Sequence, residues 1–366
     1  MFLRKTYLQS RLAIPDTGEH TTDIATREPI TNLWLEVRVS NGATNNQGVV
    51  VSDVIERIDV IDGSDVIYSF DGYEAMAYTA YYCNCLPNQL ITELPGNTQN
   101  LNVVIPFGRF VGDPIYAFDP TKFMNPQVRI KWNLAAIRAV GLTGFATNTA
   151  RLTILANVME GGETPLGYLM AKEIYSWVTA AGVEYIDLPT DYPYKALLMR
   201  VHKTDTQMFG VVSALKLHVN QEQFTLFNMR MTDFIRSNSR LEPILSYDHV
   251  YHCADGDTVR QILEYAGTPL FAAASGGDQT FLWTGLGIGT GLYNTWIAGA
   301  PDANDRTVYA KVNGYCPFGC LWYNFGRQNE PGDYFDAPAF RSVRLEATGA
   351  VAAGAAFVGL IQARPY

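Results

Sequence analysis

The sequence predicts an all-β protein that contains two related antiparallel β-sandwiches in tandem, and three observations support this prediction. Aromatic residues make up 12% of the 366 residues, and 31 Gly and 18 Pro supply turns, a composition typical of strands. The pattern contains no regular helices between the strands, which a parallel sheet would require. A set of landmarks also recurs in the same order in both halves of the chain, which indicates an internal duplication.

In the first half, residues 33–41 alternate apolar and polar side chains, as a half-buried strand does. Residues 51–70 predict two strands around the turn Asp62-Gly63-Ser64-Asp65, and residues 71–82 predict a short helix. Strands are then expected over 102–106, 126–133 and 150–159.

The second half repeats this order. Residues 197–205 alternate like the first strand, and residues 212–227 predict two strands around the polar turn 220–223. Residues 228–237 occupy the place of the short helix. Strands are then expected over 320–324, 342–348 and 355–364.

The clearest landmark is a loop that occurs once in each half. It reads "FGRFVGDPIYAFDPTKF" over residues 107–123 and "FGRQNEPGDYFDAPAF" over residues 325–340. In both copies a glycine at a strand end permits a sharp turn, and the arginine that follows is expected to tie down the connection. We therefore expect Arg109 and Arg327 to anchor these loops through Asp119 and Asp336, or through backbone carbonyls. A duplicated ligand site is the alternative interpretation.

The phenylalanines of the two loops share a predicted role. Each trio should close the open end of its sandwich: Phe107, Phe118 and Phe123 in the first half, and Phe325, Phe335 and Phe340 in the second.

About eight strands per half favour the jelly roll over the smaller immunoglobulin-like sandwich. We thus predict two tandem eight-stranded antiparallel jelly rolls, a double jelly roll, with short helices and long loops. The expected division is an N-terminal arm over 1–28, a first jelly roll over 29–162 and a second over 163–366, with the boundary in the Gly- and Pro-containing segment 160–169. The second half carries an insertion of roughly 60 residues, a large loop over about 236–320, which predicts a functional surface.

Catalytic and metal-binding patterns are weak. The glycine-rich "GLGIGTG" over 285–291 lacks the Lys-Ser/Thr ending of a phosphate-binding loop. The acidic cluster of Glu330, Asp333 and Asp336 has the composition of a glycosidase site, but it fits a solvated loop or a calcium site equally. Zinc-like groupings have poor spacing: Cys83-x-Cys85, Cys316-x3-Cys320 and His249-x2-His252-Cys253. We predict no enzyme activity, no catalytic residue, no cofactor and no bound metal.

The paired loops, the helix after each hairpin and the enlarged loop in one copy resemble the double jelly-roll major capsid proteins of tailless icosahedral viruses. This lineage includes membrane-containing bacteriophages and adenovirus, and the resemblance spans residues 29–366. It implies a homotrimer whose six jelly rolls form a pseudo-hexameric tile of an icosahedral virion shell. It also implies synthesis in the host cytoplasm and contacts with neighbouring capsomers and with minor capsid or penton proteins. The inserted loop would form an outward tower or clasp the trimer.

Charge agrees with these expectations. A net charge of −9 argues against a protein that coats nucleic acid, so no sequence-specific nucleic-acid partner is expected. The N-terminal segment instead carries Arg4, Lys5 and Arg11 without an acidic residue up to residue 15. Our hypothesis is that this arm faces inward and contacts an internal viral membrane or neighbouring shell proteins, and the alternative is a disordered tail. The odd number of cysteines, five, fits a reducing cytoplasm, and no secretory signal is apparent.

A second function class stays open on the sequence alone. Jelly rolls also occur in carbohydrate-binding and glycoside-cleaving proteins, where aromatic rings stack on sugars. The aromatic residues that would serve this purpose are Trp283, Tyr293, Trp296, Trp322 and Tyr323. A capsid subunit should form trimers and shells, whereas a lectin or hydrolase should stay small and bind glycans.

Overall fold

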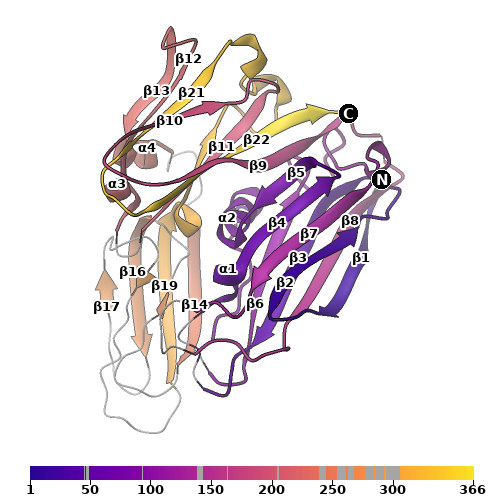
Figure 1. Cartoon of the computed structure of the whole chain (residues 1–366), viewed down its shortest axis with the longest axis vertical. Helices are drawn as coiled ribbons and strands as arrows, with labels where there is room; N and C mark the ends of the chain where they lie inside the picture. Colours follow the sequence, from indigo (N-terminus) through magenta and orange to yellow (C-terminus); the bar gives the residue numbers. More distant parts are fainter. Residues whose placement is uncertain are drawn as a thin grey trace.

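The computed structural model describes residues 1–44, 46, 49–92, 94–137, 143–162, 164–203, 206–238 and 313–366, and between 239 and 312 it describes only the strands. The first half and the second half form two adjacent β-sandwiches (Figure 1).

The first sandwich consists of two four-stranded antiparallel layers. One layer has the strand order β1-β8-β3-β6, and the other has the order β2-β7-β4-β5. The strands are β1 (Phe2–Ala13), β2 (Thr17–Asp23), β3 (Ile30–Ser40), β4 (Ile55–Asp62), β5 (Asp65–Phe70), β6 (Thr98–Pro106), β7 (Pro126–Asn133) and β8 (Arg151–Glu160). Alternate residues of each strand face the core, as Leu33, Leu35 and Val37 do in β3, where all three are fully buried.

The second sandwich repeats the same pairing with its own eight strands. Counted from its first strand, it has the orders 1-8-3-6 and 2-7-4-5, as β9-β22-β11-β20 and β10-β21-β12-β13. These strands are β9 (Gly167–Val178), β10 (Gly182–Leu188), β11 (Tyr194–His202), β12 (Val212–Val219), β13 (Phe224–Arg230), β20 (Cys320–Asn324), β21 (Val343–Gly349) and β22 (Ala355–Pro365). This order, in which the first strand pairs with the last, is that of a jelly roll, and the predicted double jelly roll is confirmed.

The N-terminal segment differs from its prediction. The sequence predicts residues 1–28 as an arm outside the first jelly roll, but they supply its first two strands. β1 pairs antiparallel with β8, and β2 pairs with β7. The first jelly roll therefore begins at Phe2 and not at residue 29. The second begins with β9 at Gly167, seven residues after the end of β8.

The two jelly rolls are joined through one continuous sheet of eight strands. At the junction, β5 of the first half runs parallel to β9 of the second, with Tyr68 opposite Ala171 and Ser69 opposite Lys172. The sheet order β2-β7-β4-β5-β9-β22-β11-β20 thus fuses an inner layer of each sandwich. This shared backbone pairing fixes the orientation of one half relative to the other.

The short helices follow the fifth strand of each half, as predicted. In the first half, α2 (Gly72–Cys83) begins at the cap residue Asp71, whose carboxylate accepts hydrogen bonds from the backbone N–H groups of Tyr73 and Glu74, both at 2.8 Å. The Glu74 side chain in turn accepts from the Asp71 N–H at 3.0 Å, which completes a capping box. The equivalent helix of the second half is α4 (Met231–Asn238). Smaller helices precede the fourth strands, α1 (Val51–Val54) and α3 (Met208–Val211).

The insertion in the second half has a sheet of its own. β14 (Leu245–Cys253), β19 (Arg306–Tyr315), β16 (Thr268–Gly276) and β17 (Trp283–Gly285) form a four-stranded sheet, and β15 (Gln261–Ile262) pairs with β18 (Leu292–Tyr293). The sheet extends from the second jelly roll alongside the first (Figure 1). The glycine-rich segment 286–291 lies outside the described residues.

Candidate functional site

The two F-G-R loops are built around the same pairing of an arginine with an aspartate. In the first loop, Arg109 binds Asp113 through two parallel hydrogen bonds, Nε to Oδ2 and Nη2 to Oδ1, both 2.6 Å long. Such a forked contact is the strongest form of this ion pair. In the second loop, Arg327 Nε donates to Asp333 Oδ2, and Nη2 lies 3.3 Å from Oδ1.

The glycine before each arginine makes room for that aspartate. A Cβ atom at Gly108 would lie 2.9 Å from the Asp113 Cβ and would overlap the Tyr116 carbonyl oxygen. A Cβ atom at Gly326 would likewise lie 2.9 Å from the Asp333 Cβ, and Gly326 has a φ of +86°. The F-G-R pattern is therefore a packing requirement in both halves.

The predicted aspartate partners are wrong in both loops. Asp119 does not pair with Arg109 but accepts hydrogen bonds from the N–H of Thr121 (3.0 Å) and from its hydroxyl (2.7 Å), and so caps the 3-10 turn η1 (Pro120–Lys122). Asp336 precedes the equivalent turn η4 (Ala337–Ala339) without a side-chain cap. The true partners belong to a Gly-Asp pair in each variable segment, 112–113 and 332–333, which the sequence shows in both copies.

The phenylalanine trios form two equivalent stacks of rings. In the first half, the ring centroids of Phe107 and Phe118 are 4.8 Å apart, and those of Phe118 and Phe123 are 4.7 Å apart. In the second half, the centroids of Phe325 and Phe335 lie at 5.3 Å, and those of Phe335 and Phe340 at 5.2 Å. These rings belong to or pack against the hydrophobic core of their own half.

The two loops also contact each other. Arg109 Nη1 donates a 2.6 Å hydrogen bond to the carbonyl oxygen of Asn329 in the second loop. Tyr334 of the second loop is buried in the core of the first half, and its hydroxyl donates to the Gln328 carbonyl at 2.9 Å. The duplicated motifs therefore form one interface between the halves, and not two separate sites.

A buried lysine lies next to this interface. Lys195, on β11, is 7% exposed, and its ammonium lies 5.4 Å from the centre of the Trp322 ring. Burial, together with the nearby charge of Arg109, lowers the pKa of Lys195 to about 8.

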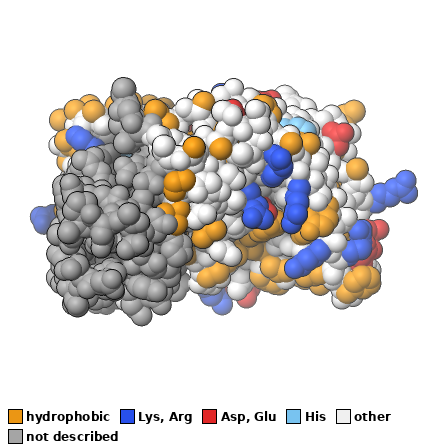
Figure 2. Space-filling model, turned by 90° about the horizontal axis from the view of Figure 1, so that it is seen from below, with side chains coloured by type: hydrophobic (Ala, Val, Ile, Leu, Met, Phe, Trp, Pro, Cys, Tyr) orange, Lys and Arg blue, Asp and Glu red, His pale blue; other side chains and the backbone are white. Residues whose placement is uncertain are grey.

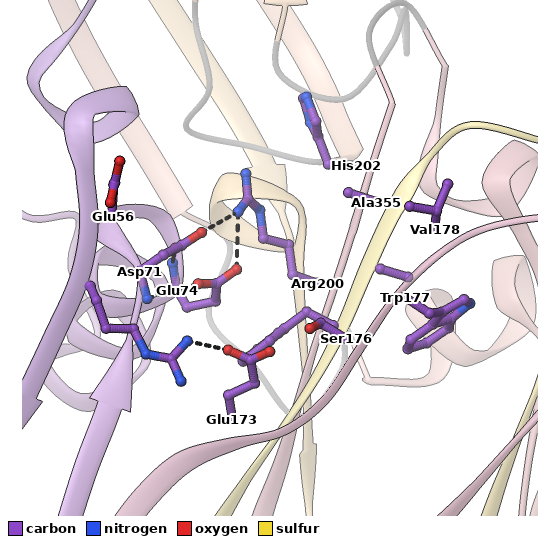
Figure 3. A pocket seen from close by; sticks show the side chains of 13 residues that line it. Glu56, Asp71, Glu74, Glu173, Ser176, Trp177, Val178, Arg200, His202 and Ala355 are labelled. Carbon is purple, nitrogen blue, oxygen red and sulfur yellow. Dashed lines mark hydrogen bonds and ion pairs between the residues drawn. The ribbon is translucent and has the colours of Figure 1, made fainter. Parts of the chain in front are cut away.

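A cluster of charges holds α2 of the first half against β11 of the second (Figure 3). Arg200 Nη1 donates to Asp71 Oδ2 at 2.8 Å and to Glu74 Oε1 at 3.0 Å. The same guanidinium lies 4.5 Å from the centre of the Tyr73 ring. One arginine of the second half thus fixes the first turn of a helix of the first half.

Aromatic side chains reinforce that contact further along α2. The Trp322 ring stacks on Tyr78 and Tyr81, with centroid separations of 5.7 and 5.1 Å. The Tyr81 hydroxyl donates to the carbonyl oxygen of Cys320 at 2.8 Å. Because α2 is buried along most of its length, it acts as a packed wedge between the two sandwiches.

The two carboxyl groups beside Arg200 titrate differently. Burial raises the pKa of Glu74 well above its usual range, and the nearby Asp71 carboxylate adds to this effect more than Arg200 offsets it. Burial would also raise the pKa of Asp71, but the Arg200 charge and the hydrogen bonds from Glu74 and the Tyr73 N–H lower it overall. At acidic pH the cluster therefore keeps one carboxylate against one guanidinium.

This cluster lines a pocket of about 530 Å³ between the halves. On its other side, Arg57 of β4 forms an ion pair with Glu173 of β9 (Figure 3). The pocket's arginines and the carboxylates of Asp71, Glu74 and Glu173 are thus engaged with one another. This pairing fastens the halves together.

The three basic residues near the N-terminus do not form a cluster. Arg4 pairs with Glu160, Nε to Oε1 at 2.5 Å, whereas Lys5 lies opposite Asn157 and forms no ion pair with a described residue. Arg11 lies seven residues further along β1, roughly 23 Å from Arg4 at the rise of an extended strand. The contact predicted for Arg4, Lys5 and Arg11 stays a prediction.

One group of possible metal ligands in the described part of the chain is hydrogen-bonded among its own members. His218, Glu222 and Glu346 come together, but His218 Nδ1 accepts from the Glu222 N–H at 3.2 Å, and Nε2 lies 2.9 Å from Glu346. Lys216 Nζ lies 2.8 Å from Glu222 Oε2 and 3.7 Å from Glu346 Oε2. Cys83 and Cys85 are exposed, whereas Cys316 and Cys320 are buried. His249, His252 and Cys253 have side chains outside the described residues.

Two of the aromatic residues considered for sugar stacking are packed inside the protein. Trp322 is buried against α2, and Tyr323 packs among Phe227, Phe234 and Phe325. The side chains of Trp283, Tyr293 and Trp296 lie outside the described residues. No helix in the described part of the chain is long and apolar enough to cross a membrane.

Comparison with solved structures identifies the same architecture elsewhere. The chain superposes on the major capsid protein of Sulfolobus turreted icosahedral virus with a TM-score of 0.57 and 13% identity, covering 99% of this chain and 96% of that one. The superposition on the major capsid protein P2 of bacteriophage PM2 has a TM-score of 0.55 and 9% identity, and covers 99% of this chain and 98% of that one. The superposition on VP54 of the virus PBCV-1 has a TM-score of 0.59 and 11% identity, and covers 99% of this chain and 93% of that one. These likenesses confirm the double jelly-roll fold over nearly the whole chain.

Sequence comparison gives no further guidance. No protein-family model matches the chain, and no curated protein matches it.

Proposed function

We propose that this chain is the major capsid protein of a tailless icosahedral virus and that it acts by self-assembly, not by catalysis. The observation that carries this proposal is the repeated strand order, 1-8-3-6 and 2-7-4-5, in two sandwiches that one sheet holds side by side. Three solved proteins that superpose on this chain over nearly their whole length are viral major capsid proteins.

The geometry explains how one gene product can build a closed shell. A homotrimer of double jelly rolls presents six similar sandwiches around its threefold axis, and so fits into a pseudo-hexagonal array. Such a tile requires that the two halves of each chain keep a fixed orientation. The shared sheet, the α2 wedge and the Arg109–Asn329 hydrogen bond supply that rigidity.

The inserted sheet formed by β14, β19, β16 and β17 is the part of the chain that departs from the repeat. Our proposal assigns it the role of a tower or a trimer clasp. Minor capsid or penton proteins would bind at the edges of the trimer, and the finished protein would reside in the virion after synthesis in the host cytoplasm.

An inner contact would involve the end of the molecule that carries Lys5 and the first F-G-R loop. Phe2, Val111 and Leu166 are exposed apolar side chains there, at 66%, 51% and 72% exposure. Together with Lys5 they suit the surface of an internal anionic membrane, where a basic side chain contributes about 1 kcal/mol. Flotation of the trimer with anionic vesicles tests this contact, and the variant Phe2→Ser/Leu166→Ser should float less than the wild type.

Assembly is tested by size-exclusion chromatography with light scattering, followed by negative-stain microscopy of the concentrated protein. The expected result is a trimer that forms hexagonal arrays or closed shells. A protein that stays monomeric at high concentration and binds glycans on an array would overturn the capsid proposal in favour of a carbohydrate-binding tandem sandwich.

A further inference from the structure

Three arginine side chains line a pocket on the first jelly roll, where β1 and β3 end and β8 begins. Arg11, Arg38 and Arg151 border a volume of about 430 Å³ whose lining includes no acidic residue. The pocket lies at the end of this jelly roll away from the chain termini. Figure 2, which views the molecule from below, shows Lys and Arg side chains gathered over that end.

Two of these arginines are placed directly against each other. Arg38 on β3 and Arg151 on β8 are opposite residues in the antiparallel pairing of the two strands. Both side chains are exposed to solvent, and like charges on directly opposite residues are destabilising. Among the residues that the structure describes, Arg38 has no ion-pair or hydrogen-bond partner for its guanidinium, and Arg151 donates only to the carbonyls of Ala150 (2.8 Å) and Asn148 (3.4 Å).

The third arginine reaches the pocket through an irregularity of its strand. The pairing of β1 with β8 shifts register between Gln9 and Leu12, and Arg11 within this bulge has a φ of 45°. The left-handed conformation is disfavoured for a residue with a Cβ atom, and bulges commonly redirect a side chain at a functional site. The Arg11 N–H is held by the Thr153 hydroxyl at 3.3 Å.

We propose that this pocket binds a small phosphate or sulfate ester. A tetrahedral oxyanion would neutralise the opposed guanidinium groups of Arg38 and Arg151 and would explain why the chain keeps the strained conformation of Arg11. This site is independent of the shell-building role proposed above.

The chemistry of the lining favours an ester over a simple carboxylate. Three guanidinium groups offer forked donors from three neighbouring strands, which matches a group with three or more oxygen acceptors. The hydroxyls of Ser40, Thr98 and Thr153 add neutral hydrogen-bonding groups for the organic part of the ligand. The pocket volume falls in the range of small-molecule sites and exceeds that of one tetrahedral anion.

Isothermal titration calorimetry of the full chain at low ionic strength tests the proposal with glucose 6-phosphate, glucose 6-sulfate and uncharged glucose. At least one ester should bind and glucose should not, and the tighter of the two esters identifies the anion. The variant Arg38→Ser/Arg151→Ser should weaken that binding about tenfold or more, because it removes two charge-assisted contacts. The control Lys5→Ser/Arg27→Ser changes the net charge equally and should keep the affinity within about twofold.

A second variant separates binding from folding. Arg11→Gly removes a guanidinium but places glycine where φ is positive, so the variant should fold as well as the wild type and still bind the ester more weakly. Failure of the wild type to bind either ester overturns the proposal, and so does equal weakening in the Lys5/Arg27 control. A third outcome would also overturn it: the wild type binds neither ester, and Arg38→Ser/Arg151→Ser folds but does not assemble. The pocket would then be a contact with acidic groups of a neighbouring chain.

Discussion

The two F-G-R loops use the same device in different surroundings. Each has a glycine that accommodates an aspartate, an arginine that binds it and a stack of three phenylalanines. In the first loop, however, the side chains of Arg109 and Asp113 are only 6% and 0% exposed, whereas those of Arg327 and Asp333 are 75% and 32% exposed. Duplication preserved the local geometry, and the place of each copy in the fused molecule decides how much it contributes to stability.

The largest contrast is expected from removal of the aspartate in the first loop. Asp113→Ala leaves the Arg109 charge buried without its partner, which should lower the free energy of unfolding by about 3–5 kcal/mol. Urea denaturation at neutral pH, followed by tryptophan fluorescence, measures this loss. A loss no greater than that of the matching variant in the second loop would contradict the distinction between the two.

The glycines offer a test in which the second loop should be the more sensitive. A Cβ atom is obstructed at Gly108 and at Gly326, but only Gly326 has a positive φ, +86°. Both alanine variants should lose roughly 1–3 kcal/mol of stability, with Gly326→Ala towards the upper end.

Gly63 provides the control for that experiment. Its φ is +60°, yet nothing lies within 4 Å of the position that a Cβ atom would take there, so Gly63→Ala isolates the cost of the backbone conformation from the cost of the clash. Equal losses for Gly63→Ala and Gly326→Ala in urea denaturation would show that the Asp333 contact has no part in the effect.

The helices that follow the fifth strands, α2 and α4, should differ in how the pH affects stability. Because the folded state raises the pKa of Glu74, the protonated form favours folding at low pH, and this stabilisation is lost as the pH rises through the folded pKa. Asp71, whose pKa is lowered, has the opposite effect and destabilises the fold only as the pH falls towards its folded pKa. Glu74→Gln should therefore flatten the decline in thermal midpoint that occurs as the pH rises above about 4.3, the ordinary pKa of glutamate.

In the second half, Asp233 occupies the first turn of α4 and is exposed. Asp233→Asn should leave the pH profile of the thermal midpoint unchanged. A profile that is flattened equally by both substitutions would show that the Arg200 cluster is not the source of the pH dependence.

The smallest effect is expected from Asp333→Ala. Its ion pair with Arg327 is exposed, and ion pairs in water are largely compensated by solvation and side-chain entropy. The urea midpoint should not shift measurably, at low or at high salt. A clear shift that disappears with salt would mean that the exposed copy of the loop also contributes to stability.

The strands with regular alternation are predictable because one face of each is buried. β3 and β7 present apolar residues to the core at every second position, and the turn at Gly63 marks a hairpin. The N-terminal strand escapes prediction because β1 is an edge strand with exposed residues on both faces, and only Leu8 and Leu12 pack against the core. Its sequence therefore carries no period that would distinguish it from an arm.

The contacts between the two halves cannot be predicted from the sequence, for a different reason. Arg200 is 129 positions from Asp71 in the chain, and nothing in the local spacing connects them. The aspartate partners of Arg109 and Arg327 can be narrowed to two candidates per loop from the sequence, because both a Gly-Asp pair and a Phe-Asp pair recur in the two copies. Only the packed backbone decides between the two aspartates, because it places one of them beside the glycine.

Because the first strand of the chain pairs with the eighth, β1 must wait during synthesis for its partner to be translated. β1 ends at Ala13, but its partner β8 begins at Arg151, so at 5–20 residues per second the ribosome supplies the partner roughly 7–30 seconds later. During that interval the nascent chain exposes an unpaired edge that neighbouring nascent chains can join. This sheet of the first jelly roll therefore cannot be completed until nearly half of the message has been translated.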